Sequence, residues 1–279
     1  MPRKREYGVC RLTGLKGKFV KAHLLPKALT RPGVAGTPFV ETSSHGDRPK
    51  RSWSSCYDTE LVTADGEAIL ANFDNEAISE LRKQKLVWSG FGPLQKLPHG
   101  PDHDAIGQTG LGVRKLCGTD FRALRLFFLS LLWRAAASRH EAFGGVTLAA
   151  DELAELGSRL VARDPGPPTY FAVHLIQLST LGAVQNLSPF GKFMRIPELG
   201  DVKAHSVPIF RIYLDGLIAH IHPNRDTAYD GGKMGTLVLG QRDFTAVLTI
   251  EYEISFQHED MQTRLAEAWT IWPNLMEKL

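Results

Sequence analysis

The chain has 279 residues, enough to bury a large core without disulfide bonds or a structural metal. Its three cysteines, Cys10, Cys56 and Cys117, are far apart and form no Cys-x-x-Cys pair, which excludes a disulfide framework and a four-cysteine zinc site. No apolar run approaches the roughly 20 residues of a transmembrane helix, and no signal-type apolar segment follows the charged start. We therefore expect a cytoplasmic protein with no membrane partner.

The charge is unevenly distributed along the chain. The formal net charge is +3, but residues 1–56 contain twelve Lys or Arg against three acids, a local charge of +9, which leaves −6 for the other 223 residues. Such segregation is typical of nucleic-acid contact, because Lys and Arg beside the phosphate backbone release condensed counterions. The alternative is a solvated basic surface that has no partner.

The stretch Cys10–Pro26 predicts a hairpin that ends in a histidine. Gly14 and Gly17 break the hairpin, and a strand resumes at Phe19. The sequence Ala-His-Leu-Leu-Pro then closes the segment with His23 at the end of the strand. This places an imidazole beside a basic surface.

A strand that ends in His, a hydrophobic pair and Pro, followed by a loop and a helix, resembles the HNH or ββα-finger (His-Me finger) nucleases. The resemblance covers roughly the first third of the chain. It implies that His23 activates water against a phosphodiester. It also implies that the helix after the loop faces this histidine across a small cleft.

Residues 27–55 are rich in Gly, Pro, Ser and Thr and predict a long loop. A structureless insertion of this length is more often functional than accidental. Trp53 beside Arg51 offers a base-stacking surface, or alternatively folds back onto the core. Together with the cations before it, the loop supplies the residues expected to contact DNA: Lys16, Lys18, Lys21, Lys27, Arg31, Arg48, Lys50, Arg51 and Trp53.

The apolar periodicity predicts a helix over residues 65–85. Glu67 and Asp74, seven residues apart, fall on its apolar face, where an unpaired charge would cost several kcal/mol. We expect His23, Glu67 and Asp74 to converge into a catalytic group. The alternative is that the two acids only pair with Arg or His to fix the helix.

The metal ligands of the HNH pattern are incomplete. Such nucleases usually have an acid just before the histidine or ligands on the facing helix, and many add a cysteine zinc knuckle. Here Ala22 precedes His23, Glu67 stands where a ligand histidine often stands, and Cys10 alone remains of the knuckle. Glu67 and Asp74 could still bind Mg²⁺ through carboxylate oxygens and waters.

Two other groups contain residue types that bind metals. One lies in a region rich in Pro and Gly, which favours a solvated turn: His99, Asp102, His103 and Asp104. The other is the pair His220 and His222, which point the same way from a predicted strand but have no third ligand at a useful spacing.

Residues 86–91 predict a short strand, and residues 92–118 predict a loop-rich connection. The most apolar run of the chain follows at Phe121–Ser138. It predicts a central buried helix capped by Thr119 or Asp120. Its one polar stripe contains Arg134, which needs a carboxylate or phosphate partner. We expect Arg134 to support the site by pairing with an acid such as Glu67 or Asp74, with a phosphate contact as the alternative. The Leu-Phe-Phe-Leu-Ser-Leu-Leu-Trp-Arg segment also resembles one in uncharacterised bacterial proteins with similar His-Leu-Leu-Pro-type starts.

The last part of the chain predicts a helix over 151–163 and then an antiparallel sheet with an Asp215-Gly216 hairpin turn. The expected strands cover 170–178, 192–197, 207–214, 217–222, 236–239 and 244–250. A closing helix over 259–270 should face inward through Leu265, Ala266 and Trp269.

The predicted fold is therefore α+β: an HNH-like ββα finger, a central buried helix, and an antiparallel sheet with a C-terminal helix. We divide the chain into an HNH-like basic DNA-contacting region (1–91), the loop-rich connection (92–118), and a helix-plus-sheet region that packs on it (119–279). The sequence leaves the oligomeric state open.

The predicted function is that of a DNA-acting hydrolase. The resemblance favours an HNH-like endonuclease with His23 as general base, and with Mg²⁺ as its cofactor. Because metal ligands are missing, a DNA glycosylase that flips and excises a base, modified or not, without a cofactor is the first alternative. A non-catalytic DNA-binding module is the second. The bacterial resemblance alone suggests a role in defence against phage or foreign DNA.

Overall fold

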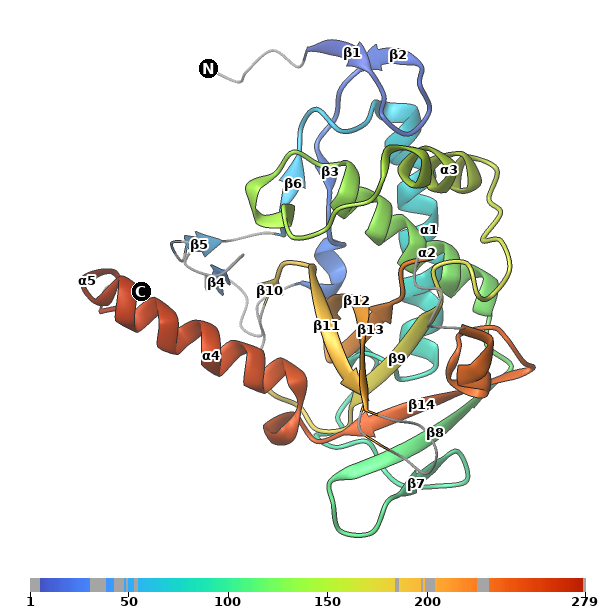
Figure 1. Ribbon diagram of the computed structural model, residues 1–279, viewed down its shortest axis with the longest axis vertical. Coiled ribbons are helices and arrows are strands. Elements are labelled where there is room, and N and C mark those ends of the chain that lie inside the picture. Colours follow the sequence, from blue (N-terminus) through green and yellow to red (C-terminus); the bar gives the residue numbers. More distant parts are fainter. Residues whose placement is uncertain are drawn as a thin grey trace.

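The computed structural model describes residues 6–30, 39–42, 48, 50–52, 55–183, 186–196, 198, 204–224 and 231–277. It is a mixed α+β structure in which three helices cover one face of a large sheet (Figure 1). A fourth helix extends away from this body toward the C-terminus. None of the helices in the described part of the chain is long and apolar enough to cross a membrane.

Seven strands form the main sheet, in the order β11-β12-β13-β9-β14-β8-β7. Every neighbouring pair is antiparallel except β9 and β14, which run parallel. The predicted antiparallel sheet is thus confirmed in its main part. The strands are β7 (His103–Ala105), β8 (Leu111–Cys117), β9 (Val173–Leu178), β11 (Phe190–Ile196), β12 (His205–Leu214), β13 (Leu217–Ile221) and β14 (Phe244–Ile250).

The turn between β12 and β13 is the predicted Asp-Gly hairpin. Asp215 and Gly216 have φ angles of 47° and 82°, both in the left-handed region that a tight two-residue hairpin requires. The turn also carries a link to the helical side, since the Trp88 backbone nitrogen donates to the Asp215 carbonyl at 2.8 Å.

The helices are α1 (Ala64–Lys83), α2 (Phe121–Ala137), α3 (Ala150–Val161), α4 (Phe256–Ile271) and α5 (Pro273–Met276). The Asp120 side chain caps α2 by accepting from the Ala123 nitrogen at 2.9 Å. As predicted, α2 is buried almost throughout its length. It packs between α1, α3 and the sheet, so its side chains hold the main core together.

The strands of the N-terminal part of the chain, together with β10, form three small sheets. β1 (Tyr7–Val9) pairs with β2 (Lys16–Lys18), and β3 (Ala22–His23) pairs with β6 (Tyr57–Asp58). β4 (Phe39–Thr42) pairs with β5 (Lys50–Ser52) and with β10 (Asn186–Leu187). Two corrections follow: the strand that contains His23 pairs with a distant segment instead of closing the first hairpin, and the predicted loop over 27–55 contains a hairpin of its own.

Further predictions of local structure were wrong. Residues 88–90 form a 3₁₀ helix in place of the strand predicted over 86–91. Residues 231–237 form 3₁₀ turns on either side of a kink at Gly235, where a strand was expected to begin. The predicted loop over 92–118 contains β7 and β8, because β14 pairs with β8 along its full length. On α4, Ala266 and Trp269 are exposed and Leu265 is half-buried, whereas Gln257 and Ala268 are buried.

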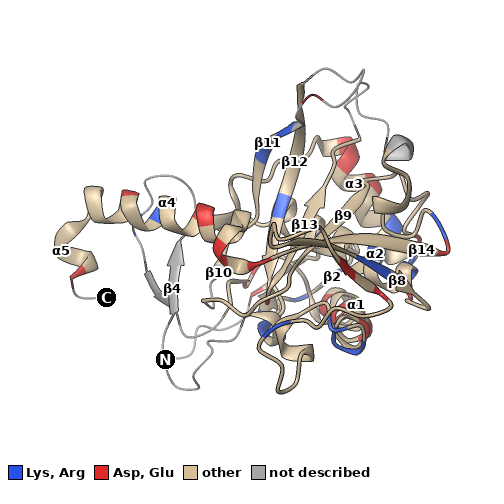
Figure 2. Cartoon of the chain, turned by 90° about the horizontal axis from the view of Figure 1, so that it is seen from below, with Lys and Arg blue, Asp and Glu red and all other residues tan. Residues whose placement is uncertain are grey.

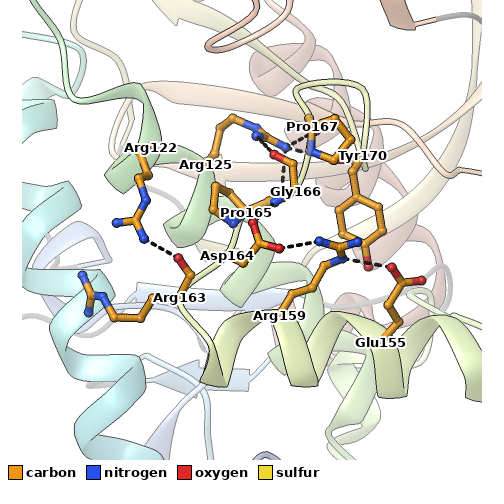
Figure 3. Close-up of polar contacts among 10 residues, drawn as sticks. All are labelled: Arg122, Arg125, Glu155, Arg159, Arg163, Asp164, Pro165, Gly166, Pro167 and Tyr170. Carbon is orange, nitrogen blue, oxygen red and sulfur yellow. Dashed lines mark hydrogen bonds and ion pairs between the residues drawn. The ribbon is translucent and has the colours of Figure 1, made fainter.

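The Pro-rich connection after α3 is held by arginine side chains (Figure 3). Arg125 is buried and donates to the carbonyls of Pro165, Gly166, Pro167 and Tyr170 at 2.6–3.3 Å. Burial lowers the pKa of its guanidinium to about 10. Arg159 donates to Asp164 at 2.6 Å and to Glu155 at 2.9 Å. These bonds fix the end of α3 against α2.

Candidate functional site

The candidate site forms where β3 meets α1 and α2. Ala22, Leu24 and Leu25 are buried, and the Leu24 nitrogen donates to the Cys56 carbonyl at 2.9 Å. The apolar residues on both sides of His23 therefore anchor the chain in the core, while His23 itself stays partly buried at the surface of that core. The His-Leu-Leu-Pro corner is thus a rigid support for an imidazole.

Arg134 links the three elements. Its side chain is 1% exposed, and its two terminal nitrogens donate to the two carboxylate oxygens of Asp74 at 3.0 and 2.7 Å. The same guanidinium donates to the carbonyl of Leu70 at 3.1 Å and to that of His23 at 3.3 Å. The predicted pairing of Arg134 with an acid is present, and its partner is Asp74. Through these bonds α2 holds both α1 and the histidine strand.

Glu67 lies two helical turns before Asp74 on α1, about 10 Å along the helix axis. It is partly buried, and no described residue donates a side-chain or backbone hydrogen bond to its carboxylate. Burial raises the pKa of Glu67 to about 7; the Asp74 charge adds to the rise and the Arg134 charge opposes it. Glu67 can therefore hold a proton near neutral pH, as a general acid must.

The pKa of His23 is shifted in the direction that suits a general base. Burial lowers its pKa below 6.5, and the positive charges of Lys21, Lys27 and Arg134 lower it further, whereas Asp74 acts in the opposite direction. The imidazole is therefore neutral at pH 7 and able to accept a proton.

Arg134 contacts Asp74 and the backbone of His23, whereas Glu67 has no hydrogen bond to Arg134 or His23. Asp74 and Arg134 act electrostatically on both His23 and Glu67. The three predicted residues differ in state: His23 is a neutral base, Glu67 is an acid with a pKa near 7, and Asp74 has both oxygens bonded to a buried guanidinium.

The residues at this place do not fit a divalent metal. Mg²⁺ binds through free carboxylate oxygens, and both oxygens of Asp74 already accept from Arg134. Nowhere in the described ranges do three or more His, Cys, Asp or Glu side chains form a group able to hold a metal ion.

The basic residues predicted to contact DNA are only partly described. Lys16 and Lys18 are exposed on β2, and Lys21, Lys27 and Arg48 are also exposed. Lys50 and Arg51 lie on β5, while Arg31 and Trp53 lie outside the described residues. Figure 2 shows basic and acidic residues interspersed over the described elements.

In the two groups considered as alternative metal sites, the buried histidines are bonded inside the protein, whereas His99, Asp102 and Asp104 are exposed. His103 contacts the Pro98 carbonyl at 3.0 Å and the Thr249 hydroxyl at 2.9 Å. His220 accepts from Arg211 at 2.9 Å, and His222 lies 3.1 Å from His174, a neighbour that sequence spacing could not reveal because it lies on another strand. Burial lowers the pKa of His174 to about 4 and that of His222 to about 3, so both rings are neutral at pH 7.

Neither the cavity beside His103 nor the one beside Trp133 is lined by His23, Glu67 or Asp74. One of about 210 Å³ lies beside His103 and β8. The other, of about 490 Å³, lies between the β1–β2 turn, α2 and α3 and is lined by Trp133 and Arg11 among others. The sequence analysis missed this second cavity, because its walls come from three segments that are far apart in the chain.

No protein-family model matches the chain, and no curated protein and no solved structure matches it either. The HNH resemblance therefore remains a prediction that depends on the residues themselves.

Proposed function

We propose that the chain is a DNA-acting hydrolase in which His23 is the general base and Glu67 the general acid. The observation that carries this proposal is that the pKa of His23 is lowered and the pKa of Glu67 is raised, and that the Arg134–Asp74 pair acts on both groups. Perturbed pKa values of this kind cluster at catalytic sites, where an acid must keep its proton and a base must be free of one at the working pH.

For an endonuclease, His23 takes a proton from water as the water oxygen attacks phosphorus. The bond from phosphorus to the leaving sugar oxygen breaks, and Glu67 gives its proton to that oxygen. Lys21 and Lys27 are the exposed cations that act on the His23 imidazole, and they would stabilise the negative charge on the phosphate. Asp74 and Arg134 are positioning residues that hold α1, α2 and β3 together.

The order of elements supports the nuclease as the first candidate. His23 lies on β3, which pairs antiparallel with β6, and α1 follows β6 after five residues. The helix with the acids follows the histidine strand, as the HNH resemblance implies, but the histidine lies on the first strand of this strand–strand–helix unit, whereas the resemblance implies the second strand of a hairpin. Residues 24–56 are inserted between the two strands.

A DNA glycosylase is the second candidate, and the state of Glu67 favours it. A carboxylic acid that keeps its proton near pH 7 can protonate a leaving base, while a neutral histidine activates the attacking water. This reaction breaks the base–sugar bond and leaves an abasic site.

Incubation with supercoiled plasmid and with phage-modified DNA, with and without EDTA, tests the proposal. The nuclease predicts nicked or linear DNA, and the glycosylase predicts sites that break only after alkali. His23→Ala and Glu67→Gln should each lower the rate at least about 100-fold. His99→Ala and Glu60→Gln change exposed residues of the same types and should retain the native rate.

Intact DNA before and after alkali, at protein concentrations where binding is saturated, would reject catalysis and leave a DNA-binding module. Native activity in His23→Ala would reject this site even if the DNA is cleaved. All three cysteines are free thiols, and we propose that the protein acts in a reducing cytoplasm, on phage or foreign DNA.

A further inference from the structure

The β1–β2 hairpin packs on the rest of the protein through two glycines. Gly8 and Gly17 lie directly opposite each other in the register of the two strands. A Cβ added to Gly8 would lie 2.3 Å from the ring of Phe19, and one added to Gly17 would lie 3.0 Å from the side chain of Thr63, the residue before α1. Since neither contact leaves room for a side chain, this face of the hairpin points inward. The hairpin lies beside the start of α1, at the top of Figure 1.

The other face of the hairpin points outward, because successive residues of a strand point to opposite faces. Tyr7 lies opposite Lys18 on this outer face. Val9 lies opposite Lys16. Side chains that are direct partners have their Cβ atoms about 4.5–5.5 Å apart. The tyrosine is 80% exposed and the valine 52%, and both lysines are exposed, so the four side chains form a patch in contact with solvent, the hairpin patch.

The side chains of the hairpin patch are not used elsewhere in the fold. Within the described ranges, neither lysine side chain forms an ion pair or a hydrogen bond, and no aromatic ring or cation lies over the ring of Tyr7. Lysines on other elements differ: Lys83 pairs with Glu80 at 3.2 Å, and Lys192 pairs with Asp260 at 3.3 Å. The two cations of the patch are therefore available to an anionic partner.

The hairpin patch has the two features with which proteins bind single-stranded nucleic acid, an exposed ring on which a base can stack and cations beside the backbone. Residues 6–18 contain three cations, Arg11, Lys16 and Lys18, against one acid, Glu6. In a duplex the bases are already stacked on one another, so a surface tyrosine reaches a base face only in a single strand. The charge and the ring together favour a single strand as the partner.

We propose that the hairpin patch binds a single-stranded stretch of nucleic acid, with a base stacked on Tyr7 and phosphates at Lys16 and Lys18. Between the hairpin and His23 the next exposed residue is again a lysine, Lys21 on β3. A strand held by the patch can thus continue toward the candidate site. That the strand is a substrate of this site rests on the proposed function, whereas binding to the patch does not.

Fluorescence anisotropy of a labelled oligothymidylate of about 20 nucleotides measures binding to the full chain, with a duplex and an oligouridylate of the same length for comparison. The native chain should bind the single strand at least about tenfold more tightly than the duplex. Tyr7→Ala, at a position too exposed to affect folding, should weaken binding of the single strand at least about fivefold. Tyr7→Phe keeps the ring and should bind like the native chain. Trp269→Ala removes a ring that is 49% exposed on α4 and should change nothing.

The salt dependence of binding tests the two lysines. Replacing both Lys16 and Lys18 with Gln should lower the slope of log affinity against log salt by about 1.4, because each phosphate contact on a single strand contributes about 0.7. Replacing both Lys83 and Lys115, which are exposed on other elements, is the matched control and should leave the slope unchanged.

Equal affinity of the native chain and Tyr7→Ala for the single strand would overturn the inference. So would equal affinity for duplex and single strand, or a native salt slope in the chain that lacks Lys16 and Lys18. Tighter binding of the oligothymidylate identifies the partner as DNA, and tighter binding of the oligouridylate identifies it as RNA. Single-strand binding that needs Tyr7, without hydrolysis of DNA, contradicts the proposed function alone. Hydrolysis of DNA by a chain whose Tyr7→Ala variant binds with native affinity contradicts the role of the patch alone.

Discussion

At the scale of single residues, the protonation of Glu67 connects stability to chemistry. A carboxyl whose pKa is about 7 in the folded protein and near 4.5 in the unfolded chain binds more protons when folded. Its contribution to stability is therefore complete below about pH 4.5, declines as the pH rises to about 7, and stays low above that value. Above about pH 7 the ionised Glu67 carboxylate is partly buried, and this lowers the free energy of unfolding.

Glu67→Gln removes this pH dependence, because the amide has no proton to lose. We expect the variant to gain melting temperature relative to the native chain at pH 8, and to gain little or nothing at pH 5. Scanning calorimetry at the two pH values measures the difference. Glu60→Gln, at an exposed position, is the control and should give the same difference at both values. A constant difference for Glu67→Gln as well would contradict the raised pKa.

At the scale of elements, the Arg134 guanidinium is the junction of α1, α2 and β3. It donates to a carboxylate and a carbonyl on α1 and to a carbonyl on β3, so each element is held by a bond from α2. The Asp74 side chain is 17% exposed, so the Arg134–Asp74 ion pair keeps some contact with water and is not fully desolvated.

Arg134→Met should lower the free energy of unfolding by about 3 kcal/mol, since it leaves a half-buried carboxylate without its partner. Adding Asp74→Leu in the same chain should recover part of that loss, because the unpaired charge is then gone too. Urea unfolding of the native chain, both single variants and the double variant gives the coupling energy. Single losses that simply add would show that the two side chains are independent.

The predictions of helices and turns that were correct are those that depend only on residues close together in the sequence. The apolar period located α1 and α2 to within one or two residues at each end, and the Asp-Gly pair located the β12–β13 turn. Strand pairings between distant segments could not be predicted from the sequence. The partner of β3 lies more than thirty residues on, and β8 is a strand because β14 pairs with it.

At the scale of the whole molecule, the chain forms a main core on one face of the sheet and a smaller one on the other. The main core joins α1, α2 and α3 to the sheet, and the second packs Phe256 and Met261 of α4 against the opposite face. The sequence predicted the α+β class, the central helix and an acid partner for Arg134. It did not predict the raised pKa of Glu67, since that depends on how far the folded chain buries this carboxyl.

The site and the cavity are connected through α2. Arg134 faces α1 and the histidine strand, and the adjacent Trp133 lines the cavity toward α3. One helix thus contributes to both the candidate site and the wall of the cavity, and the arginine bonds of the 163–170 connection hold α3 against it (Figure 3).

The rate of DNA hydrolysis as a function of pH tests the central claim most directly. A neutral His23 and a protonated Glu67 coexist from below pH 6.5 to about pH 7, so the native profile should be bell-shaped, with its alkaline limb falling through about pH 7. Glu67→Gln should lose that limb together with at least about 100-fold of the rate. A native rate that keeps rising from pH 6 to pH 9, unchanged in Glu67→Gln, would contradict the assignment of Glu67 as the acid.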